Sequence, residues 1–590
     1  MKRKTNKLLM GIGLCLLVSV TTVGNILAFG TFSSALESFF GVEGGNEVDF
    51  DNNQYFEREL SSAEEASKLS AELCEEVEAE GAVLLKNNRE ALPLSKSNKV
   101  SCFGQASVDF IKGVTGGSGA IDAGNLTFEK ALRDAGLQLN DTLFNFYKTQ
   151  NKHRVVGGLA QGVSKDPYVW KLNEVPISEY NDNVKSSYSS YNDAAIVVIS
   201  RTGCENGDLP QDMSSSDSRE TRGETSILEL NQDEKDMLKH VSESGFKKTI
   251  VLLNTTNTME CGFLDEYNID ACLWVGGVGQ YGLNAVADIL VGNVNPSGKL
   301  VDTYVYDVFS SPAMQNMGNY AYVDNKGNET GHHYVTYAEG IYVGYKYYET
   351  RYEDKIINRA NVGNYDYDTT VQYPFGFGMS YTSFEWSNFE YTRNGDEIEV
   401  SVNVTNTGTK NGKEVVQAYY QSPYTDYDKE KGIEKSAVNL VDFYKTKELK
   451  PNESEVCKMT FPVEYFKSYD AKGEKTYLLE EGDYYITLAK DAHSAINNIL
   501  KEKEYDVDGD KSFVKKDTLE RKVYAKDTFT GADISNKFDD ADGGKKYLTR
   551  NNWKEMDNSG LRDGTNPNNR FDADGYIYEN QISNELKAKL

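Results

Sequence analysis

One short loop combines the residue types that acid–base chemistry needs. Residues 201–208 place the cation Arg201 and the carboxylates Glu205 and Asp208 within eight positions. A carboxylate can donate or accept a proton during bond cleavage, and a neighbouring arginine can orient it or contact a substrate. The loop directly follows the apolar run 194–200, and ligands of open α/β sheets bind beyond the carboxyl ends of strands. We therefore take 201–208 as a candidate catalytic loop, with a merely solvated charged loop as the alternative.

Two glycine-rich stretches raise the question of a nucleotide cofactor. Gly277, Gly279 and Gly282 have the spacing of a dinucleotide-binding turn, and Asp302 follows twenty residues later. However, this would be a late strand–helix unit, and an Asn-Pro-Ser-Gly sequence at 295–298 interrupts the path to Asp302. We interpret the stretch as a tight strand-to-helix turn and expect no cofactor. Residues 113–119 lack the Lys-Ser/Thr of a phosphate loop, and we expect either a flexible turn or a rim that contacts a ligand.

Charge and metal-ligating residues exclude other functions. The formal net charge of −28 repels nucleic acid, so we expect no nucleic-acid partner, whereas a neutral sugar is not disfavoured. The cysteines form no CxxC pair, and His332 and His333 lack the spacing of a metal site. The Asp-Gly clusters at 506–510 and 572–575 lack the ligand pattern of an EF-hand and are interpreted as turns. We expect no bound metal.

The elements that would position the loop alternate between strands and helices. Near-continuous apolar runs such as 194–200 and 248–254 are typical of strands buried on both faces of a parallel sheet. This alternation predicts an α/β sandwich with a mostly parallel sheet over residues 60–310. The expected strands are 100–104, 194–200, 248–254, 271–275 and 299–305, and the expected helices are 61–87, 126–137, 231–244 and 280–291.

The second half of the chain changes character twice. Residues 311–385 are rich in Tyr, Gly and Asn without a long apolar period, and we expect connecting loops and hairpins there. From 397 onward apolar and polar residues alternate strictly, which predicts an all-β sandwich over 386–492. Residues 493–590 are charged and weakly periodic, and we expect an extended linker or tail.

The amino terminus carries a membrane signal. Lys2, Arg3, Lys4 and Lys7 precede an apolar run over 8–29, which is close to the ~20 residues that span a bilayer. We expect an uncleaved transmembrane helix in 1–30, with a cleaved signal peptide as the alternative, and an acidic stalk over 31–59. Basic residues before the run stay in the cytoplasm, so we expect a single-pass cell-membrane protein with its bulk outside, touching the membrane through this helix only.

Several long segments in the correct order resemble the C-terminal half of family 3 glycoside hydrolases, the β-glucosidase and β-xylosidase group. They are 80–86 with 92–94, 116–119, 196–208, 251–260, 274–300, 373–381 and 402–420. The resemblance covers roughly residues 60–490. It implies an α/β sandwich followed by a fibronectin type III-like domain, and it accounts for the glycine-rich turn at 277–282 without a nucleotide.

The resemblance also implies a reaction and roles for the candidate loop. In this family the corresponding loop donates the general acid/base, and Glu205 is the residue that matches; Arg201 and Asp208 flank it and would orient it or contact the sugar. Family members take an Asp nucleophile from a (β/α)₈ barrel of ~250 residues. We find no room for it here, and the order resembles members with the barrel last. We therefore expect a β-glucosidase-like retaining hydrolase of β-linked glycosides, inactive without a barrel domain or a separate barrel chain. The alternative is a non-catalytic cell-surface module that binds carbohydrate or protein.

Overall fold

The computed structural model describes residues 59–113, 126–150, 172–201, 226–316, 320–323, 329–334, 337–536 and 547–556. The chain forms two compact units, Met1–Lys68 and Leu69–Leu590, and almost all described residues belong to the second. The expected anchor at 1–30 and nearly all of the expected stalk lie outside the described residues. Within the described ranges, no helix has both the length and the apolar composition needed to cross a bilayer.

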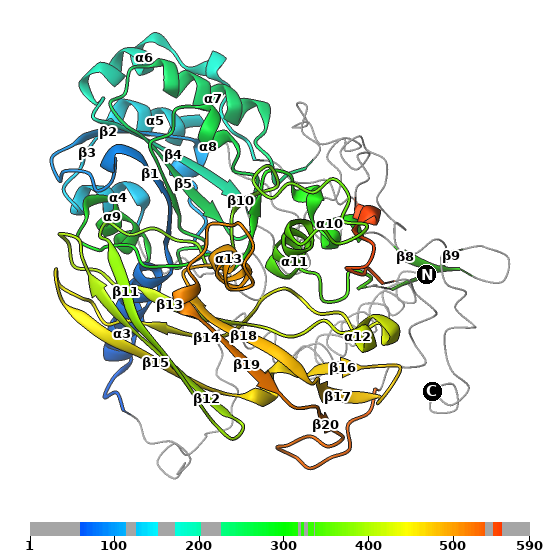
Figure 1. Cartoon of the computed structure of the whole chain (residues 1–590). Coiled ribbons are helices and arrows are strands. Elements are labelled where there is room, and N and C mark those ends of the chain that lie inside the picture. Colours follow the sequence, from blue (N-terminus) through cyan, green and yellow to red (C-terminus); the bar gives the residue numbers. More distant parts are fainter. Residues whose placement is uncertain are drawn as a thin grey trace, which may run out of the picture. The chain divides into compact units, whose positions relative to one another are not determined.

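A six-stranded mixed sheet organises the first half of the second unit (Figure 1). The strand order is β1-β6-β5-β4-β2-β3, and every neighbouring pair is parallel except β1 with β6. This arrangement confirms the mostly parallel sheet expected from the sequence. The strands are β1 (Val83–Asn87), β2 (Lys99–Phe103), β3 (Gln138–Leu139), β4 (Ala194–Arg201), β5 (Thr249–Thr255) and β6 (Ala271–Trp274).

Helices cover both faces of this sheet. Alternate residues of the central strand β4 therefore pack into two different hydrophobic cores, one on each face. Ala195, Val197 and Ile199 of β4 pack with α5 (Asp141–Gln150), α6 (Asp182–Ser187), α7 (Gln232–Glu243) and α8 (Phe263–Glu266). The alternate residues of β4 pack with α4 (Phe128–Asp134) and α9 (Leu283–Val291) on the other face. Since β4 and β5 are buried along their whole length, the expected interpretation of their apolar runs is confirmed.

Two expected element boundaries were wrong. The helix expected over 61–87 ends at Gly81 (α3, Ala63–Gly81), and the Val-Leu-Leu sequence that follows forms the edge strand β1 instead. At the start of this helix the Ser62 hydroxyl accepts a bond from the Glu65 N–H at 3.1 Å. The last expected strand shortens to β7 (Tyr304–Val305), which pairs with β10 (Val371–Tyr373) outside the main sheet.

Residues 311–385 contain more than the expected loops and hairpins. They form α10 (Pro312–Asn316), the hairpin β8 (Tyr320–Val323) with β9 (Glu329–Tyr334), and the twelve-residue helix α11 (Tyr345–Ile356). The sequence hides α11 because polar residues are buried on it beside tyrosines: Glu349 and Asp354 have no exposed surface. An amphipathic period, the usual signal of a helix, is therefore missing.

An all-β sandwich follows, as expected. Three strands, β11 (Phe384–Asn394), β12 (Glu397–Asn406) and β15 (Ser454–Pro462), face a second sheet. The second sheet has the order β14 (Asn439–Lys445), β13 (Val415–Gln421), β18 (Gly482–Ala489) and β19 (Val514–Leu519). A separate three-stranded sheet consists of β16 (Ser468–Asp470), β17 (Thr476–Leu479) and β20 (Lys522–Tyr524). The alternating residues Ile398, Val400, Val402 and Val404 all point into the core between the sheets.

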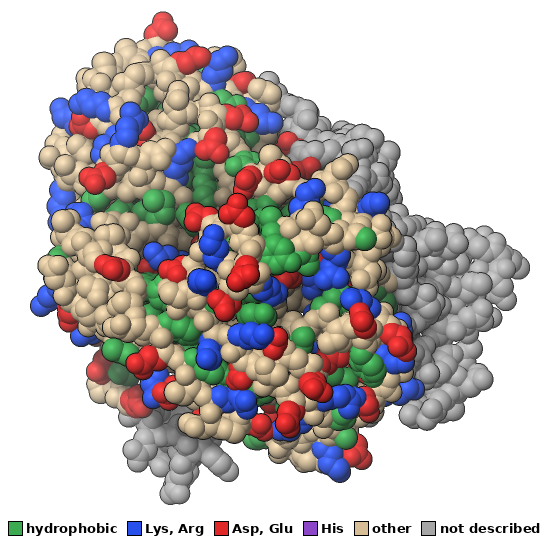
Figure 2. Space-filling model, viewed as in Figure 1, with side chains coloured by type: hydrophobic (Ala, Val, Ile, Leu, Met, Phe, Trp, Pro, Cys, Tyr) green, Lys and Arg blue, Asp and Glu red, His purple; other side chains and the backbone are tan. Residues whose placement is uncertain are grey.

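Much of the segment expected as a tail folds back instead. Helix α13 (Ala492–Glu502) packs against β18, and β19 and β20 complete sheets of the sandwich. Farther along, the buried Trp553 donates from Nε1 to Asp354 Oδ2 of α11 at 2.8 Å. The space-filling view shows acidic and basic side chains interspersed over one face rather than gathered by sign (Figure 2).

Candidate functional site

The carboxyl ends of four sheet strands meet at one edge, where the sequence places its candidate loop. Strands β2, β4, β5 and β6 end at Phe103, Arg201, Thr255 and Trp274. Arg201 lies directly opposite Thr255 in the register of β4 and β5. This edge is where open α/β sheets bind ligands.

Arg201 forms a buried ion pair with Glu234 at this edge. Its Nη1 donates to Glu234 Oε1 at 2.8 Å, and its Nη2 donates to Oε2 at 2.7 Å. The remaining N–H groups bond to the carbonyls of Ser200, Ile227 and Glu229. We call this arrangement the Arg201–Glu234 clasp. Arg201 directly precedes the segment 202–225, and its partners Ile227, Glu229 and Glu234 follow that segment, so the clasp holds the two flanking positions together.

Glu234 is held as firmly as Arg201. It lies in the first turn of α7, where the Asn231 side chain accepts a bond from the Glu234 N–H at 2.9 Å. The Glu234 carboxylate in turn accepts a bond from the Asn231 N–H at 2.9 Å, which completes a capping box. A single carboxylate therefore starts the helix and binds the end of the central strand.

Of the three candidate residues, only Arg201 lies within the described part of the chain. Glu205 and Asp208 lie outside the described residues, so their acid/base and sugar-binding roles stay predictions. Arg201 has five N–H donors, and all five bond to acceptors within the protein. Of the two roles expected for Arg201, orienting the loop fits these contacts, while a direct bond to a sugar has no donor left to make it.

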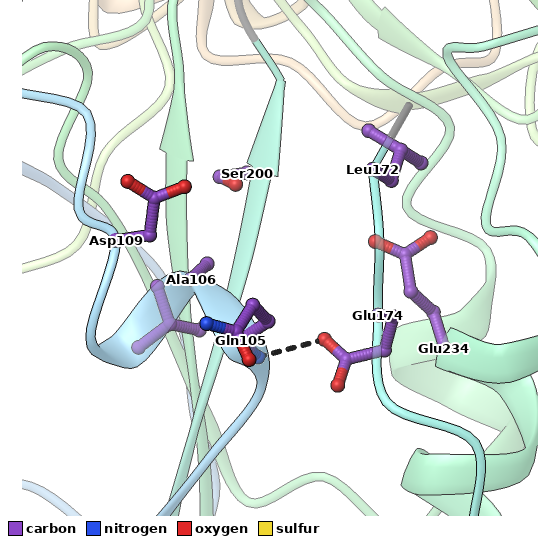
Figure 3. A pocket seen from close by; sticks show the side chains of 8 residues that line it. Gln105, Ala106, Asp109, Leu172, Glu174, Ser200 and Glu234 are labelled. Atoms are coloured by element: carbon purple, nitrogen blue, oxygen red, sulfur yellow. Dashed lines mark hydrogen bonds between the residues drawn. The ribbon is translucent and has the colours of Figure 1, made fainter. Parts of the chain in front are cut away.

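Glu234 of the clasp also lines a small pocket (Figure 3). Its cavity of about 10 Å³ is room for roughly one water molecule. The carboxyl groups of Glu234 and the buried Glu174 lie on one side of it, and the carboxyl group of Asp109 lies on the other. It is lined by Gln105, Ala106, Asp109, Leu172, Glu174, Val198, Ser200 and Glu234.

Glu174 is a feature of this edge that the sequence did not reveal. Its carboxyl accepts backbone N–H bonds from Gln105 at 2.9 Å and from Val175 at 2.8 Å. Burial raises the pKa of Glu174 to about 8, and the negative charge of Glu234 adds to this while the two hydrogen bonds oppose it. Glu174 is thus mostly neutral at pH 7. No motif or apolar period marks its position in the sequence.

Asn254, at the end of β5, ties two loops of the edge together. Its side chain accepts a bond from the Ile111 N–H at 2.6 Å and donates to the Ile111 carbonyl at 2.9 Å. It also donates to the Gly276 carbonyl at 2.6 Å. The loops that follow β2 and β6 are therefore held side by side by one buried amide.

The glycine turn after β6 packs against α3 and has no room to spare. A Cβ at Gly279 would lie 2.8 Å from Cys74 Sγ, and one at Gly282 would lie 2.3 Å from the Val278 carbonyl oxygen. The Gly279 N–H donates to the Lys112 carbonyl at 2.6 Å. These contacts support a close-packed strand-to-helix turn. Of the second glycine stretch, residues 114–119 lie outside the described residues.

Comparison with known proteins gives two family matches and several relatives. Residues 82–345 match the glycosyl hydrolase family 3 C-terminal domain, and residues 414–492 match a fibronectin type III-like domain. The β-glucosidase of Ruminococcus albus is 33% identical over 426 residues, which cover 71% of this chain and 39% of the relative. β-Glucosidase A of Butyrivibrio fibrisolvens is 31% identical over 460 residues, which cover 72% and 50%.

A solved structure shows the same fold. β-Glucosidase 3B of Thermotoga neapolitana in complex with glucose superposes with a TM-score of 0.59 at 27% identity. The match covers 78% of this chain and 55% of that chain. The chain thus spans about half, or less, of the length of the relatives it matches.

Proposed function

We propose that this chain, which belongs to glycoside hydrolase family 3, supplies the acid/base side of an active site that hydrolyses β-glucosides. The observation that carries the proposal is the Arg201–Glu234 clasp. It fixes the ends of the segment containing Glu205 at the carboxyl edge of the sheet, beside Thr255. A proton donor must be positioned precisely if it is to reach a substrate that another domain binds, and the clasp provides a rigid attachment for the loop that carries it.

The chemistry follows the retaining mechanism of glycosidases. Two carboxyl groups about 5–5.5 Å apart flank the glycosidic bond. Glu205 protonates the leaving oxygen while a nucleophilic carboxylate attacks the anomeric carbon, and Glu205 then takes a proton from the water that releases the sugar. In our proposal a (β/α)₈ barrel, on a separate chain or in a longer gene product, supplies that nucleophile. Asp208 orients Glu205 or binds a sugar hydroxyl.

The relatives' names support the substrate class. The two relatives named above are β-glucosidases, so a β-linked glucoside is the proposed substrate. The basic, apolar start of the chain supports a single membrane helix with the hydrolase domains outside the cell. Protease added to intact cells would then remove the bulk of the protein, and full protection would contradict this topology.

Chemical rescue tests the acid/base assignment. The full chain is combined with its barrel partner, and hydrolysis of an aryl β-glucoside is compared for the unmodified chain, Glu205→Ala and Glu243→Gln. Glu243 is an exposed carboxylate on α7 and serves as the matched control. We expect loss of activity only in Glu205→Ala, with azide restoring turnover and yielding the β-glucosyl azide. Activity that survives Glu205→Ala would reject the assignment, and binding of a glucoside without hydrolysis in any combination would favour a non-catalytic module.

A further inference from the structure

An exposed aromatic surface surrounds the small sheet β16–β17–β20, at the end of the β-sandwich that is remote from the six-stranded sheet (Figure 1). Part of this surface is a hairpin over 526–533, which an antiparallel bridge between Lys526 and Asp533 closes. The hairpin follows β20 and lies outside both ranges that match family models, 82–345 and 414–492. The family matches therefore assign it no role.

Two aromatic side chains of this surface extend into solvent. Phe529 at the tip of the hairpin is 97% exposed, and Tyr465 on the 3₁₀ helix Val463–Phe466 is 60% exposed. The chain segments that carry them are joined, because Thr528 Oγ1 donates to Glu464 Oε1 at 3.0 Å. An exposed phenylalanine ring contributes no buried area to the fold, so the ring of Phe529 is available to a molecule outside the chain.

The tip that carries Phe529 is fixed by hydrogen bonds of its own. Asp527 Oδ1 accepts bonds from the Thr530 N–H at 2.6 Å and from the Thr530 hydroxyl at 2.7 Å. The Gly531 N–H donates to the Asp527 carbonyl at 2.8 Å. Because the backbone on both sides of Phe529 is bonded in this way, little conformational freedom is lost when the ring binds a partner.

The adjacent sheet adds two further rings. Tyr469 and Tyr477 lie opposite each other in the register of β16 and β17, and their ring centroids are 5.2 Å apart. Lys467 lies over the Tyr477 ring at 5.1 Å and also bonds to Glu464, which links this sheet to the 3₁₀ helix. We call the four rings together the aromatic platform: Tyr465, Tyr469, Tyr477 and Phe529.

The charges around the aromatic platform are balanced within the chain. Four ion pairs surround it: Glu464 with Lys467, Asp396 with Lys522, Glu474 with Arg521, and Asp533 with Lys526. Each pair has a net charge of zero, so this surface has little long-range attraction for a nucleic acid or for a charged protein surface. The balance favours a neutral ligand.

A sugar has the chemistry that matches these groups. The C–H faces of a pyranose ring are apolar and can stack on an aromatic ring, while its hydroxyl groups can bond to the tyrosine hydroxyls. The threonine hydroxyls at 528 and 530, which already donate to carboxylates, can still accept bonds from it. The rings lie on an open surface rather than in an enclosing pocket, which suits successive units of a polymer better than one monosaccharide.

We propose that the aromatic platform binds a chain of β-linked glucose units and so holds a polymeric substrate on the protein, apart from the carboxyl edge that carries the Arg201–Glu234 clasp. The choice of a β-glucan rests on the proposed function. The existence of a binding surface rests on the exposed rings, on the fixed hairpin tip and on the balanced charges around them.

Depletion of the full chain from solution by insoluble β-glucans tests this site. Swollen cellulose and curdlan are the probes, and granular starch, an α-glucan, is the reference polymer. Two variants alter the platform, Phe529→Ala and Tyr465→Ala. Two controls leave it intact: Phe443→Ala removes an exposed ring on β14, and Glu205→Gln alters the candidate catalytic loop.

We expect the unmodified chain to bind at least one of the two β-glucans more tightly than starch. Binding should weaken about three- to tenfold in each platform variant, the effect of one lost ring contact, and should stay unchanged in both controls. Circular dichroism verifies that each variant is folded, and Tyr465→Ala decides the result if Phe529→Ala does not fold.

Three outcomes would overturn the proposal. The first is no depletion by either β-glucan, or depletion no stronger than that by starch. The second is binding that both platform variants retain, or that Phe443→Ala weakens equally, which would place the polymer elsewhere. The third is a dimer in sedimentation that Phe529→Ala dissociates, which would assign the platform to a second copy of the chain. Depletion needs neither hydrolysis nor a barrel partner, so this proposal and the azide rescue of Glu205→Ala fail separately.

Discussion

Arg201 and Glu234 lie 33 residues apart in the sequence and form two parallel N–H···O bonds in a fully buried setting. Such a bidentate pair has favourable hydrogen-bond geometry. Removing either partner is nevertheless strongly destabilising, because the other charge is then left unpaired in the interior. The clasp is therefore a place where a single substitution should act on both the fold and the candidate catalytic loop.

Breaking the clasp should destabilise the domain strongly. We expect Glu234→Gln to lower the free energy of unfolding by about 3–5 kcal/mol, because Arg201 then lacks a charge partner in the interior. Urea denaturation measures this effect. The control is Lys247→Met, which removes a largely exposed ion pair with Asp193 and should cost less than about 1 kcal/mol. Equal effects of the two substitutions would contradict the special role of the clasp.

Glu174 should make stability depend on pH. Its pKa is about 8 in the folded protein and about 4.3 in the unfolded chain, so the folded state holds the proton longer. The contribution of Glu174 is fully present below pH 4.3 and declines as the pH rises towards 8, by about 1.4 kcal/mol per pH unit.

The variant Glu174→Gln separates this effect from simple damage. Gln keeps the shape but cannot accept both backbone bonds equally well, so we expect a loss of stability at low pH together with a flatter profile between pH 5 and 8. Denaturation curves across this range provide the measurement. A slope identical to that of the unmodified chain would show that Glu174 does not titrate there.

His493 should make a second pH-dependent contribution to stability, in which the protonated form carries a positive charge. Its Nδ1 lies 2.9 Å from Glu349 Oε2, and its ring stacks on Tyr367. Burial opposes the charged ring, but the Glu349 carboxylate outweighs it and raises the pKa of His493. The stabilisation is complete below the unfolded pKa of about 6.5 and is lost as the pH rises through the folded value.

Nuclear magnetic resonance of the imidazole signals checks this directly. We expect Glu349→Gln to lower the pKa of His493, since the attraction that raises it is removed while burial remains. His240 serves as an internal reference, because its own pKa is lowered by burial and by Lys185. A His493 pKa that does not respond to Glu349→Gln would contradict the assigned cause.

The segment 547–556 should be required for stability. Trp553 is fully buried against α11, and Arg550 bonds to both Glu353 and Asp354. We expect Trp553→Ala to cost about 3–5 kcal/mol through lost packing and the lost bond to Asp354. Thermal unfolding measures it, with the exposed Lys554→Ala as control. A melting temperature unchanged by Trp553→Ala would mean that the segment is dispensable.

Apolar patterning made the core of the fold predictable. The runs 194–200 and 248–254 form central strands, and the helix expected over 231–244 is present as α7. The strict alternation after 397 likewise indicated the sandwich. In each of these places the local sequence and the burial of the element agree.

Buried charge explains what the sequence did not reveal. Glu349, Asp354 and Arg550 are polar residues that pair inside the protein, so α11 and the returning segment resemble solvated chain when only the sequence is considered. The same holds at the candidate site. No sequence pattern links Arg201 to Glu234 or Glu174 to Gln105, because the partners lie far apart along the chain. Pairings of this kind become visible only when the fold brings their partners together.

The clasp has a consequence for how enzymes built on this framework can diversify. Arg201 and Glu234 hold together the two chain positions that flank the segment 202–225. We therefore expect that residues between them can be added or exchanged without moving the sheet. The entropy cost of enlarging a closed loop grows slowly, by about 0.6 kcal/mol for each doubling of length. The segment 202–225 should therefore be exchangeable between homologous proteins that keep both Arg201 and Glu234. We expect such an exchange to transfer the preference for the leaving group while the recipient protein keeps its own stability.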